Sequence, residues 1–301
     1  MYKKICIAIE CFLSIFLLSA CTDYLPSKGT KETSLPTGTE VETTGDAVKL
    51  LTASIQDLDP TFEFYIQSDG IDANEVTNAI SRKINYTKKN YDMCNIKGCT
   101  MQTYRYDNYS EVTVSIRYYM SKEEYDYVNS EVERMAPILK GNSDYQTYKN
   151  IFEWICTNVK YDYDTASGEA ERFSAYDALK YKKAVCYGYA ALYQKFCDYY
   201  GLECMVLTSM DDTAHAWNVV KLNNQYYHVD TTFGAGNGDG EILWQYFMSG
   251  QDKIRYGSAY GITLAKTSYK EKPCENKNVF AMAILFLPIY VHIKNVAINI
   301  F

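Results

Sequence analysis

Two segments that favour β-structure, residues 215–222 and 225–233, are separated only by Asn223 and Asn224. A two-residue connection built from asparagine joins neighbouring antiparallel strands, because asparagine tolerates the left-handed backbone that such a turn requires. The short turn also determines which residues face each other across the hairpin. We therefore expect an antiparallel pair of strands at this place.

The hairpin register brings two chemically active side chains together. It sets His215 opposite Thr232 and places Asp230 two residues away on the same face of the sheet. His215 and Asp230 are then diagonal neighbours about 7 Å apart at the backbone, a gap that two side chains can bridge. An imidazole oriented by a carboxylate is the arrangement of a general base. For either residue alone, a polar group at a sheet edge is the simpler interpretation.

A cysteine lies at the start of a helical segment upstream of the hairpin. Residues 187–200 carry apolar side chains at helical spacing, and Gly201 is a natural stop after them. Cys186 is therefore expected at a helix N-terminus, where unsatisfied N–H groups and the helix dipole favour the thiolate over the thiol. Taken alone, a single cysteine is more simply a small buried apolar residue. With His215 and Asp230 it becomes a candidate nucleophile.

Three short motifs follow one another in this part of the chain. They are Lys183-Ala-Val-Cys186-Tyr-Gly-Tyr-Ala190, His215-Ala-Trp-Asn-Val-Val220 and Tyr226-Tyr-His-Val-Asp-Thr-Thr-Phe233. Together they resemble the motifs of the transglutaminase-like superfamily in its bacterial exported form, over residues 143–247. The resemblance implies an α+β, papain-like core in which the nucleophile helix packs on an antiparallel sheet. It further implies that Cys186 is the nucleophile, His215 the base and acid, and Asp230 the orienting carboxylate. Lys182 departs from the pattern, since relatives often have Gly there.

The resemblance implies a cysteine-dependent acyl-transfer enzyme that acts on amide bonds of peptides or proteins, with cell-wall peptide among the possible substrates. The acyl group passes to water, as in a peptidase or amidase, or to an amine, as in a transglutaminase, and the sequence does not distinguish the two. The alternative is a non-catalytic peptide- or cell-wall-binding module on the same fold. No cofactor is expected. A metal site that adds His228 is disfavoured, because His228 lies about 13 Å along the hairpin from His215.

The N-terminal residues 1–21 resemble a bacterial lipoprotein signal peptide. Lys3 and Lys4 precede an apolar run that closes with Leu18-Ser-Ala-Cys21. Small residues before a cysteine are typical of a lipoprotein cleavage box, in which Cys21 is lipidated and becomes the mature N-terminus; an ordinary signal peptide or an anchor helix is the alternative. The expected location is the extracellular face of the bacterial cell membrane, with the lipid as anchor.

The rest of the chain divides into four segments. Residues 22–46 are rich in Thr, Ser, Gly, Glu and Pro and are expected to be a flexible linker. Residues 47–140 contain helix-start spacings and an alternating strand, which predict a small α+β N-terminal domain. Residues 141–272 hold the three motifs and form the expected transglutaminase-like catalytic domain. Residues 273–301 are an apolar tail of unknown role, in which a strand, a helix and a membrane contact are all open.

Composition excludes some partners and leaves other questions open. With a formal net charge of −7 and no Lys/Arg cluster, the chain lacks the basic footprint of a nucleic-acid-binding protein. Its 30 tyrosines indicate either a surface for sugars or cell-wall polymer, or only a compositional bias. Export permits disulfides, and the spacing of Cys94 and Cys99 could accommodate one. The glycine-rich residues 234–241 lack the pattern of a phosphate or calcium loop and are interpreted as a mobile loop beside the site.

Overall fold

The structure, a computed structural model, describes residue 36 and residues 38–85, 90–209, 214–236, 240–252 and 262–270. The described residues up to Ser268 belong to one compact unit. The predicted signal peptide with Cys21 and the predicted tail 273–301 lie outside the described residues. Within the described part of the chain, no helix combines the length and the apolar character needed to cross a bilayer.

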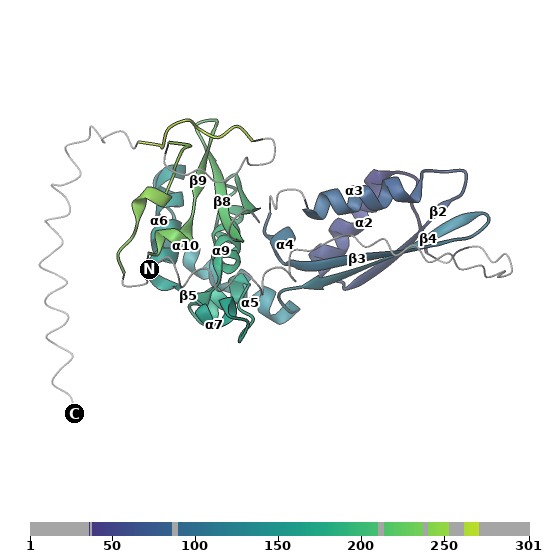
Figure 1. Ribbon diagram of the computed structural model, residues 1–301, viewed down its shortest axis with the longest axis horizontal. Coiled ribbons are helices and arrows are strands. Elements are labelled where there is room, and N and C mark those ends of the chain that lie inside the picture. Colours follow the sequence, from purple (N-terminus) through teal and green to yellow (C-terminus); the bar gives the residue numbers. More distant parts are fainter. Residues whose placement is uncertain are drawn as a thin grey trace, which may run out of the picture. The chain divides into compact units, whose positions relative to one another are not determined.

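The first part of the chain, residues 38–120, forms a four-stranded sheet with helices on one face (Figure 1). We call it the sheet module. Its elements are β1 (Thr39–Glu40), α2 (Thr44–Asp57), β2 (Thr61–Gln67), α3 (Ala73–Asn85), α4 (Tyr91–Cys94), β3 (Ile96–Arg105) and β4 (Tyr109–Tyr118). The strand order is β1-β2-β4-β3, in which β1 pairs with β2 in parallel and the other pairs are antiparallel.

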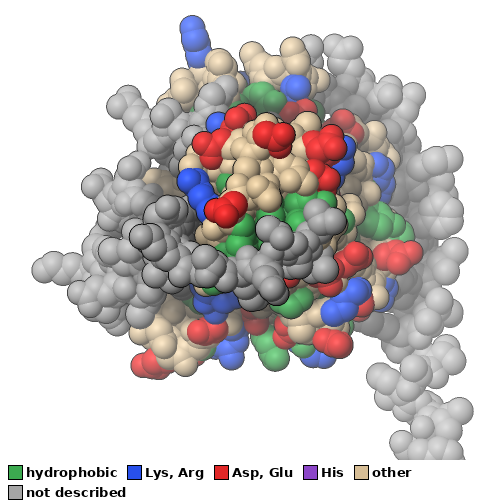
Figure 2. All heavy atoms as spheres, turned by 90° about the vertical axis from the view of Figure 1, so that its right-hand side faces the viewer, with side chains coloured by type: hydrophobic (Ala, Val, Ile, Leu, Met, Phe, Trp, Pro, Cys, Tyr) green, Lys and Arg blue, Asp and Glu red, His purple; other side chains and the backbone are tan. Residues whose placement is uncertain are grey.

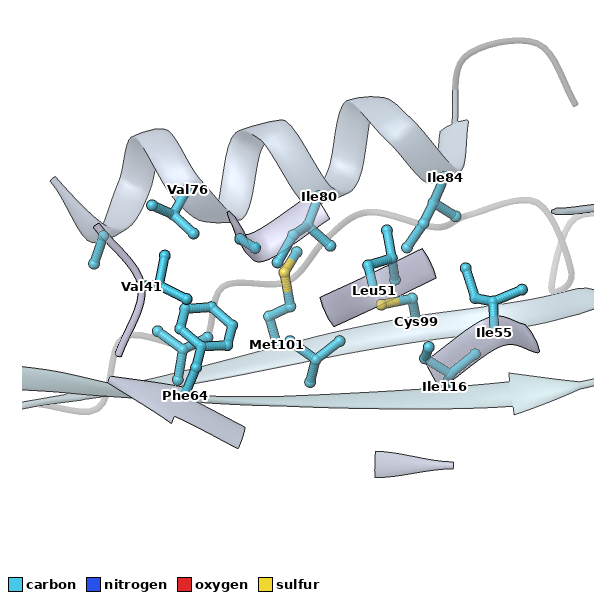
Figure 3. Close-up of a cluster of buried hydrophobic side chains, with 14 of the residues drawn as sticks. Val41, Leu51, Ile55, Phe64, Val76, Ile80, Ile84, Cys99, Met101 and Ile116 are labelled. Carbon is cyan, nitrogen blue, oxygen red and sulfur yellow. The ribbon is translucent and has the colours of Figure 1, made fainter. Parts of the chain in front are cut away.

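The core of the sheet module is aliphatic (Figure 3). On α3, Val76, Ile80 and Ile84 recur every fourth residue and so share one helix face. Leu51 of α2 and Phe64 of β2 belong to the same buried cluster. The periodicity that predicts these elements is therefore also what joins the helices to the sheet.

Figure 2 looks onto the side of the molecule that lies at the right of Figure 1. Acidic and basic side chains are interspersed there around an apolar area. No single sign of charge dominates the part of that face that belongs to the described residues.

The following residues, 121–268, form what we call the catalytic-fold module. Its elements are α5 (Lys122–Leu139), α6 (Asp144–Asn158), β5 (Lys160–Tyr161), α7 (Tyr163–Ala166), α8 (Ala175–Lys180), β6 (Lys183–Ala184), α9 (Cys186–Tyr199), β7 (Cys204–Ser209), β8 (His215–Leu222), β9 (Gln225–Val229), α10 (Thr231–Gly234) and the 3₁₀ turn η2 (Trp244–Tyr246). Strands β7, β8 and β9 form an antiparallel sheet, and α9 packs against β8 and β7. The predicted α+β class, with the cysteine helix on an antiparallel sheet, is confirmed.

Polar capping residues set several helix starts as the sequence predicts. The Ser121 side chain accepts a hydrogen bond from the Glu124 amide at 3.3 Å, and the Glu124 carboxylate accepts one from the Ser121 amide at 2.9 Å, so that α5 begins at Lys122. Ser174 and Asp177 form the same reciprocal pair at the start of α8. These starts are local chemistry, which is why a single sequence reveals them.

The predicted linker is too long. Residues 39–40 are a strand and α2 begins at Thr44, and Val41 between them is buried in the sheet module. The Thr-rich composition conceals a capping box, in which the Thr43 side chain accepts a hydrogen bond from the Asp46 amide at 3.2 Å. Polar residues that resemble a linker therefore serve here to start a helix.

Helix α5 also belongs elsewhere than the sequence places it. The prediction grouped it with residues 47–140, whereas the structure packs it on α8 and α9 of the catalytic-fold module. The Tyr200 hydroxyl donates a hydrogen bond to the Ala136 carbonyl at 2.5 Å, and the Asn150 side-chain amide donates one to the Leu139 carbonyl at 3.2 Å. Its partners lie far along the chain, and amphipathic periodicity alone does not say which surface a helix will cover.

Several tyrosines lie in the core of the catalytic-fold module. Tyr148, Tyr187, Tyr189 and Tyr193 are buried, and each hydroxyl donates to a backbone carbonyl at 2.7–3.2 Å. Buried phenols need such partners, because an unpaired hydroxyl in an apolar core is destabilising. Hydrogen bonds of these hydroxyls therefore anchor the core of this module.

The cysteines within the described residues are all buried thiols. Cys94 ends α4 and Cys99 lies within β3, and the disulfide that their spacing allowed is not formed. Burial raises the pKa of the Cys99 thiol to about 11, which keeps this group protonated and unreactive at neutral pH.

Candidate active site

Cys186 is the first residue of α9 and directly follows a short parallel strand pair. Strand β6 pairs with β5 through Lys160–Lys183 and Tyr161–Ala184, and the chain then turns at Val185 into the helix. The Val185 amide donates to the Arg172 carbonyl at 3.1 Å, which ties this turn to the preceding loop. Cys186 itself is only 2 % exposed. The predicted position of the cysteine at a helix N-terminus is correct.

Close packing around the first turn of α9 holds the cysteine in place. A Cβ atom added at Gly188 would lie 2.7 Å from the Ala184 Cβ and 2.9 Å from the Ser174 carbonyl oxygen. Both distances are shorter than real contacts allow, so the helix approaches β6 and the start of α8 only because residue 188 has no side chain. The sulfur of Cys186 is thus carried by a turn with little freedom to shift.

His215 begins β8 and contacts Asp230. Its Nε2 lies 2.7 Å from the Asp230 Oδ2, and the two side chains are 11 % and 0 % exposed. A second hydrogen bond joins His215 to Cys186. Because Asp230 engages Nε2, the ring nitrogen left for the sulfur is Nδ1. The structure therefore brings all three predicted residues into one hydrogen-bonded chain.

Asp230 reaches this position by a different route from the one predicted. The hairpin register holds from Leu222–Gln225 to Asn218–Val229, and Asn223 and Asn224 both have positive φ as the turn requires. Strand β9, however, ends at Val229, and Asp230 caps the one-turn helix α10.

The predicted strand to Phe233 and the predicted pairing of His215 with Thr232 are therefore wrong. His215 pairs with Ser209 of β7 on its other side. The Asp230 amide donates to the Tyr246 carbonyl at 2.9 Å, and the Asp230 Oδ1 accepts from the Phe233 amide at 2.9 Å. These two bonds turn the chain out of the sheet immediately after the hairpin.

The electrostatics of the site favour a protonated imidazole. Burial by itself lowers the pKa of His215, but the charge of Asp230, its hydrogen bond and the hydrogen bond to Cys186 together raise this pKa to about 10. An imidazolium between a carboxylate and a sulfur stabilises the thiolate by direct Coulomb attraction. The arrangement can thus supply a nucleophilic sulfur and a proton for a leaving group.

Comparison with known proteins supports one family. The Transglutaminase-like superfamily matches residues 132–231, a range that includes Cys186, His215 and Asp230. These residues form a transglutaminase-like domain.

Individual relatives match the same part of the chain. The kyphoscoliosis peptidases of Mus musculus and Homo sapiens are each 29 % identical over 111 residues, which are 32 % of this chain and 17 % of the peptidase. A UPF0252 protein of Methanocaldococcus jannaschii is 30 % identical over 122 residues, 33 % of this chain and 34 % of that protein. The chain thus spans only a minor part of the length of these relatives. The crystal structure of a TGase superposes with a TM-score of 0.33 at 11 % identity, over 56 % of this chain and 50 % of that one.

The loop before Cys186 contains a residue with an unusual backbone conformation. Lys182, where the resemblance led us to expect Gly, has a φ of 55°, in the left-handed region that glycine adopts without strain. Its ammonium group lies 4.7 Å from the centroid of the Trp154 ring, a favourable cation–π contact. The loop before Cys186 therefore keeps a glycine-type conformation although a lysine occupies it.

His228 has a structural role in the transglutaminase-like domain. It is buried, and its Nδ1 accepts a hydrogen bond from the Trp217 indole at 2.9 Å. Burial lowers the pKa of His228 to about 4, so it is neutral at physiological pH. The described residues contain no cluster of three or more His, Cys, Asp or Glu side chains placed to hold a metal ion. Asn237 and Asp239 of the glycine-rich segment lie outside the described residues.

Sequence reasoning missed two phenols beside the nucleophile. Burial, and then the negative charge of a Cys186 thiolate, raise the pKa of both Tyr119 and Tyr161, which remain O–H donors. Tyr161 follows from the β5–β6 pairing opposite Ala184, whereas Tyr119 comes from the end of the sheet module. Neither has a signal of its own in a chain with 30 tyrosines. The position of Tyr161 beside the nucleophile could be recognised only once its pairing with Ala184 was known.

Proposed function

We propose that this chain is a cysteine-dependent enzyme that transfers the acyl group of peptide or protein amides. The observation that carries the proposal is the chain of contacts from Asp230 through His215 to Cys186, with a 2.7 Å hydrogen bond between His215 Nε2 and Asp230 Oδ2. Asp230 orients and charges the imidazole, and the imidazolium stabilises the thiolate.

The reaction follows from these positions. The Cys186 thiolate attacks the carbonyl carbon of an amide, and a C–S bond forms as the carbonyl oxygen gains the negative charge. The Cys186 amide, in the first turn of α9, is a donor for this oxygen, and the phenols of Tyr119 and Tyr161 are further candidates. His215 gives its proton to the nitrogen as the C–N bond breaks, and a thioester and a free amine remain.

The thioester is then resolved by a second nucleophile. Neutral His215 takes a proton from water or from a primary amine, which attacks the thioester and releases Cys186. Water gives a carboxylic acid, and an amine gives a new amide. Both outcomes use the same acyl-enzyme, so the proposal covers hydrolysis and transamidation alike.

Mass spectrometry of the intact protein tests the proposal. Residues 38–270 are incubated with a peptide library, beside Cys186→Ala and, as a matched control, Cys99→Ala, whose thiol lies in β3 of the sheet module. We expect a thioester adduct in the wild type and in Cys99→Ala, and none in Cys186→Ala. Peptides that are bound but never cleaved or coupled would instead favour the non-catalytic binding module.

Two product assays separate the two acceptors. Appearance of new amine ends on peptides indicates hydrolysis. Incorporation of a labelled primary amine into a glutamine-containing peptide indicates transamidation. Both assays use Cys186→Ala to subtract uncatalysed background.

We also propose that the enzyme is exported and held at the outer face of a bacterial membrane by a lipid on Cys21. The sequence box Leu18-Ser-Ala-Cys21 supports this location. The full chain should partition with membranes, and Cys21→Ser should shift it to the soluble fraction. Equal partitioning of both forms would remove the lipid anchor from the proposal.

A further inference from the structure

The imidazole of His215 has two aromatic neighbours that lie almost parallel to it. The Phe233 ring stacks on it with centroids 4.4 Å apart and planes 15° apart, and the Trp217 ring lies at 5.9 Å and 12°. Trp217 is buried, whereas Phe233 is 37 % exposed and therefore borders the solvent side of the site. Stacking of this kind restricts rotation of the imidazole about its own bonds.

One carboxylate positions both the imidazole and the ring that covers it. Asp230 Oδ2 contacts His215 Nε2 at 2.7 Å, while Oδ1 accepts a hydrogen bond from the Phe233 amide at 2.9 Å. The ring of Tyr246 packs on Phe233 with centroids 5.4 Å apart, and the Tyr246 carbonyl accepts from the Asp230 amide. The place of Phe233 is thus determined through its backbone and through its ring.

The other aromatic neighbour of His215, Trp217, is held by a hydrogen bond in the core. Trp217 lies two residues after His215 on β8, so their side chains share a face of the sheet. Its indole N–H donates to His228 Nδ1 at 2.9 Å, and both residues are buried. Trp217 is therefore part of the rigid core, and Phe233 is the exposed member of the stack.

We propose that Phe233 is a positioning residue: its ring holds the His215 imidazole in the orientation that hydrogen-bonds Cys186 and keeps water from the His215–Asp230 bond. The inference rests on the proposed function. An aromatic face attracts an imidazolium, and exclusion of water strengthens the hydrogen bond beneath it. Phe233 acts through His215 and takes no part in bond making.

Several ionisable groups surround this arrangement and must be kept constant in any test. Asp230 and Cys186 face His215. The phenols of Tyr119 and Tyr161 face Cys186. The thiol of Cys156 and the imidazole of His228 face Asp230. Truncation of Phe233 leaves every one of these groups in the chain, so a changed pH profile reports the loss of the ring.

The test measures the rate at which iodoacetamide alkylates Cys186, from about pH 4 to about pH 10, with the modified peptide followed by mass spectrometry. We expect Phe233→Ala to alkylate about tenfold more slowly at pH 7, with its profile moved towards that of an ordinary cysteine. With an amide substrate, kcat should fall by a similar factor while KM changes little. Phe233→Tyr keeps an aromatic face and should restore the wild-type profile.

Trp244→Ala is the matched control. Trp244 is also a partly exposed aromatic residue of this region, at 42 %, but it packs on Phe152 and Phe247 instead of His215. It should alkylate with the wild-type pH profile. If Phe233→Ala fails to fold, as judged by its thermal transition, Phe233→Leu replaces it, and a drop of about threefold is expected because apolar cover remains without an aromatic face.

The outcomes separate this inference from the proposed function. If wild-type Cys186 alkylates no faster at pH 7 than a free cysteine, the proposed function fails. If the wild type reacts fast and Phe233→Ala or Phe233→Leu keeps the same profile and kcat, Phe233 does not position His215. A rise in KM with unchanged kcat and alkylation would make Phe233 a substrate contact and would equally overturn the inference.

Discussion

The two modules of this chain are built around cores of different chemistry. The sheet module buries mostly aliphatic side chains between α2, α3 and the sheet, with Ser54, Thr77 and Asn95 as its buried polar residues among those described. The catalytic-fold module buries tyrosines whose hydroxyls reach carbonyls, together with a larger polar set. That set includes Asp162, Gln194, Asn218, His228 and Asp230.

The difference bears on how the side chains of Cys186, His215 and Asp230 are held in place. Apolar contacts are non-directional, so an aliphatic core favours close packing without selecting one hydrogen-bonding orientation of a polar group. Buried hydrogen bonds are directional, and each fixes a distance and an angle. A chain of contacts from Asp230 to Cys186 needs the second kind of core, and the buried phenols and amides of the catalytic-fold module provide it.

Removal of one buried charge should break the catalytic-fold module's chemistry most strongly. In Asp230→Asn the amide can still accept from the Phe233 backbone but carries no charge to hold His215 protonated and correctly oriented. We expect kcat/KM to fall about 10³-fold or more with the fold retained, measured on an amide substrate and by circular dichroism. Asp252→Asn is the control and should retain activity. The Asp252 carboxylate accepts a hydrogen bond from the Ser268 amide at 2.7 Å. Activity of Asp230→Asn within tenfold of the wild type would contradict the assigned role.

The two described histidines should give this module a stability optimum near pH 6.5. The pKa of His215 is raised from 6.5 to about 10, so its stabilisation is complete below pH 6.5 and is lost as the pH rises through about 10. The pKa of His228 is lowered by burial to about 4, so its contribution is present above pH 6.5 and is lost as the pH falls towards 4. On each side the free energy of unfolding should change with a slope approaching about 1.4 kcal/mol per pH unit.

Thermal melting against pH measures both limbs. His215→Gln should flatten the limb between about pH 6.5 and pH 8.5, above which ordinary cysteines begin to contribute. His228→Gln should flatten the acid limb. Neither histidine lies in the sheet module, whose residues 38–120 contain none. If the variant that carries both His215→Gln and His228→Gln keeps both limbs of the stability curve, the two histidines do not cause the pH dependence.

A cavity in the aliphatic core should lower stability without touching the chemistry. Leu51 is completely buried in the sheet module, and Leu51→Ala should reduce the free energy of unfolding by about 3 kcal/mol, as judged by denaturant titration. The rate of Cys186 alkylation should stay at its wild-type value while the protein is folded. Its neighbour Leu50 is only partly buried, and Leu50→Ala should cost clearly less. Slower alkylation in folded Leu51→Ala would show that the site depends on the packing of the sheet module.

A single hydroxyl of the polar core should have the smallest effect. Tyr193→Phe removes a donor to the Tyr148 carbonyl, a bond of 3.2 Å, and leaves that buried carbonyl with one partner fewer. We expect the free energy of unfolding to fall by about 1 kcal/mol. Tyr199→Phe on the same helix alters a half-exposed phenol and should be neutral within error of the titration. If both variants changed the free energy of unfolding equally, the buried hydroxyls would not stabilise the catalytic-fold module through their hydrogen bonds.

The parts of this structure that are local in sequence could be predicted from the sequence. Cys186 at a helix start, the Asn223–Asn224 turn and the capping box at Ser121 each depend on residues within four positions of one another. The candidate residues were found because a hairpin register and a helix start are local, and because three motifs resemble a known family.

The remainder depends on long-range contacts. Asp230 to Phe233 reads as a strand, since Thr and Phe favour β-structure, yet the Tyr246 carbonyl and the Asp230 cap turn it into α10. Tyr119 and Tyr161 approach Cys186 through packing that no local pattern encodes. The attachment of α5 to α8 and α9 is of the same kind.

The two oxygens of the Asp230 carboxylate have different partners, and this affects what the residue at position 230 of a relative can indicate about catalytic activity. A relative that had lost the chemistry would still need a side-chain oxygen of Asp or Asn at position 230, because the Phe233 amide donates a hydrogen bond to it. A hydrogen-bond acceptor at position 230 is therefore weak evidence for catalytic activity. His215 contacts the Asp230 oxygen, the Cys186 sulfur and two stacked rings. Its structural role without catalysis is much smaller than that of Asp230. Replacement of His215 would therefore be the earlier sign that a relative has lost catalytic activity.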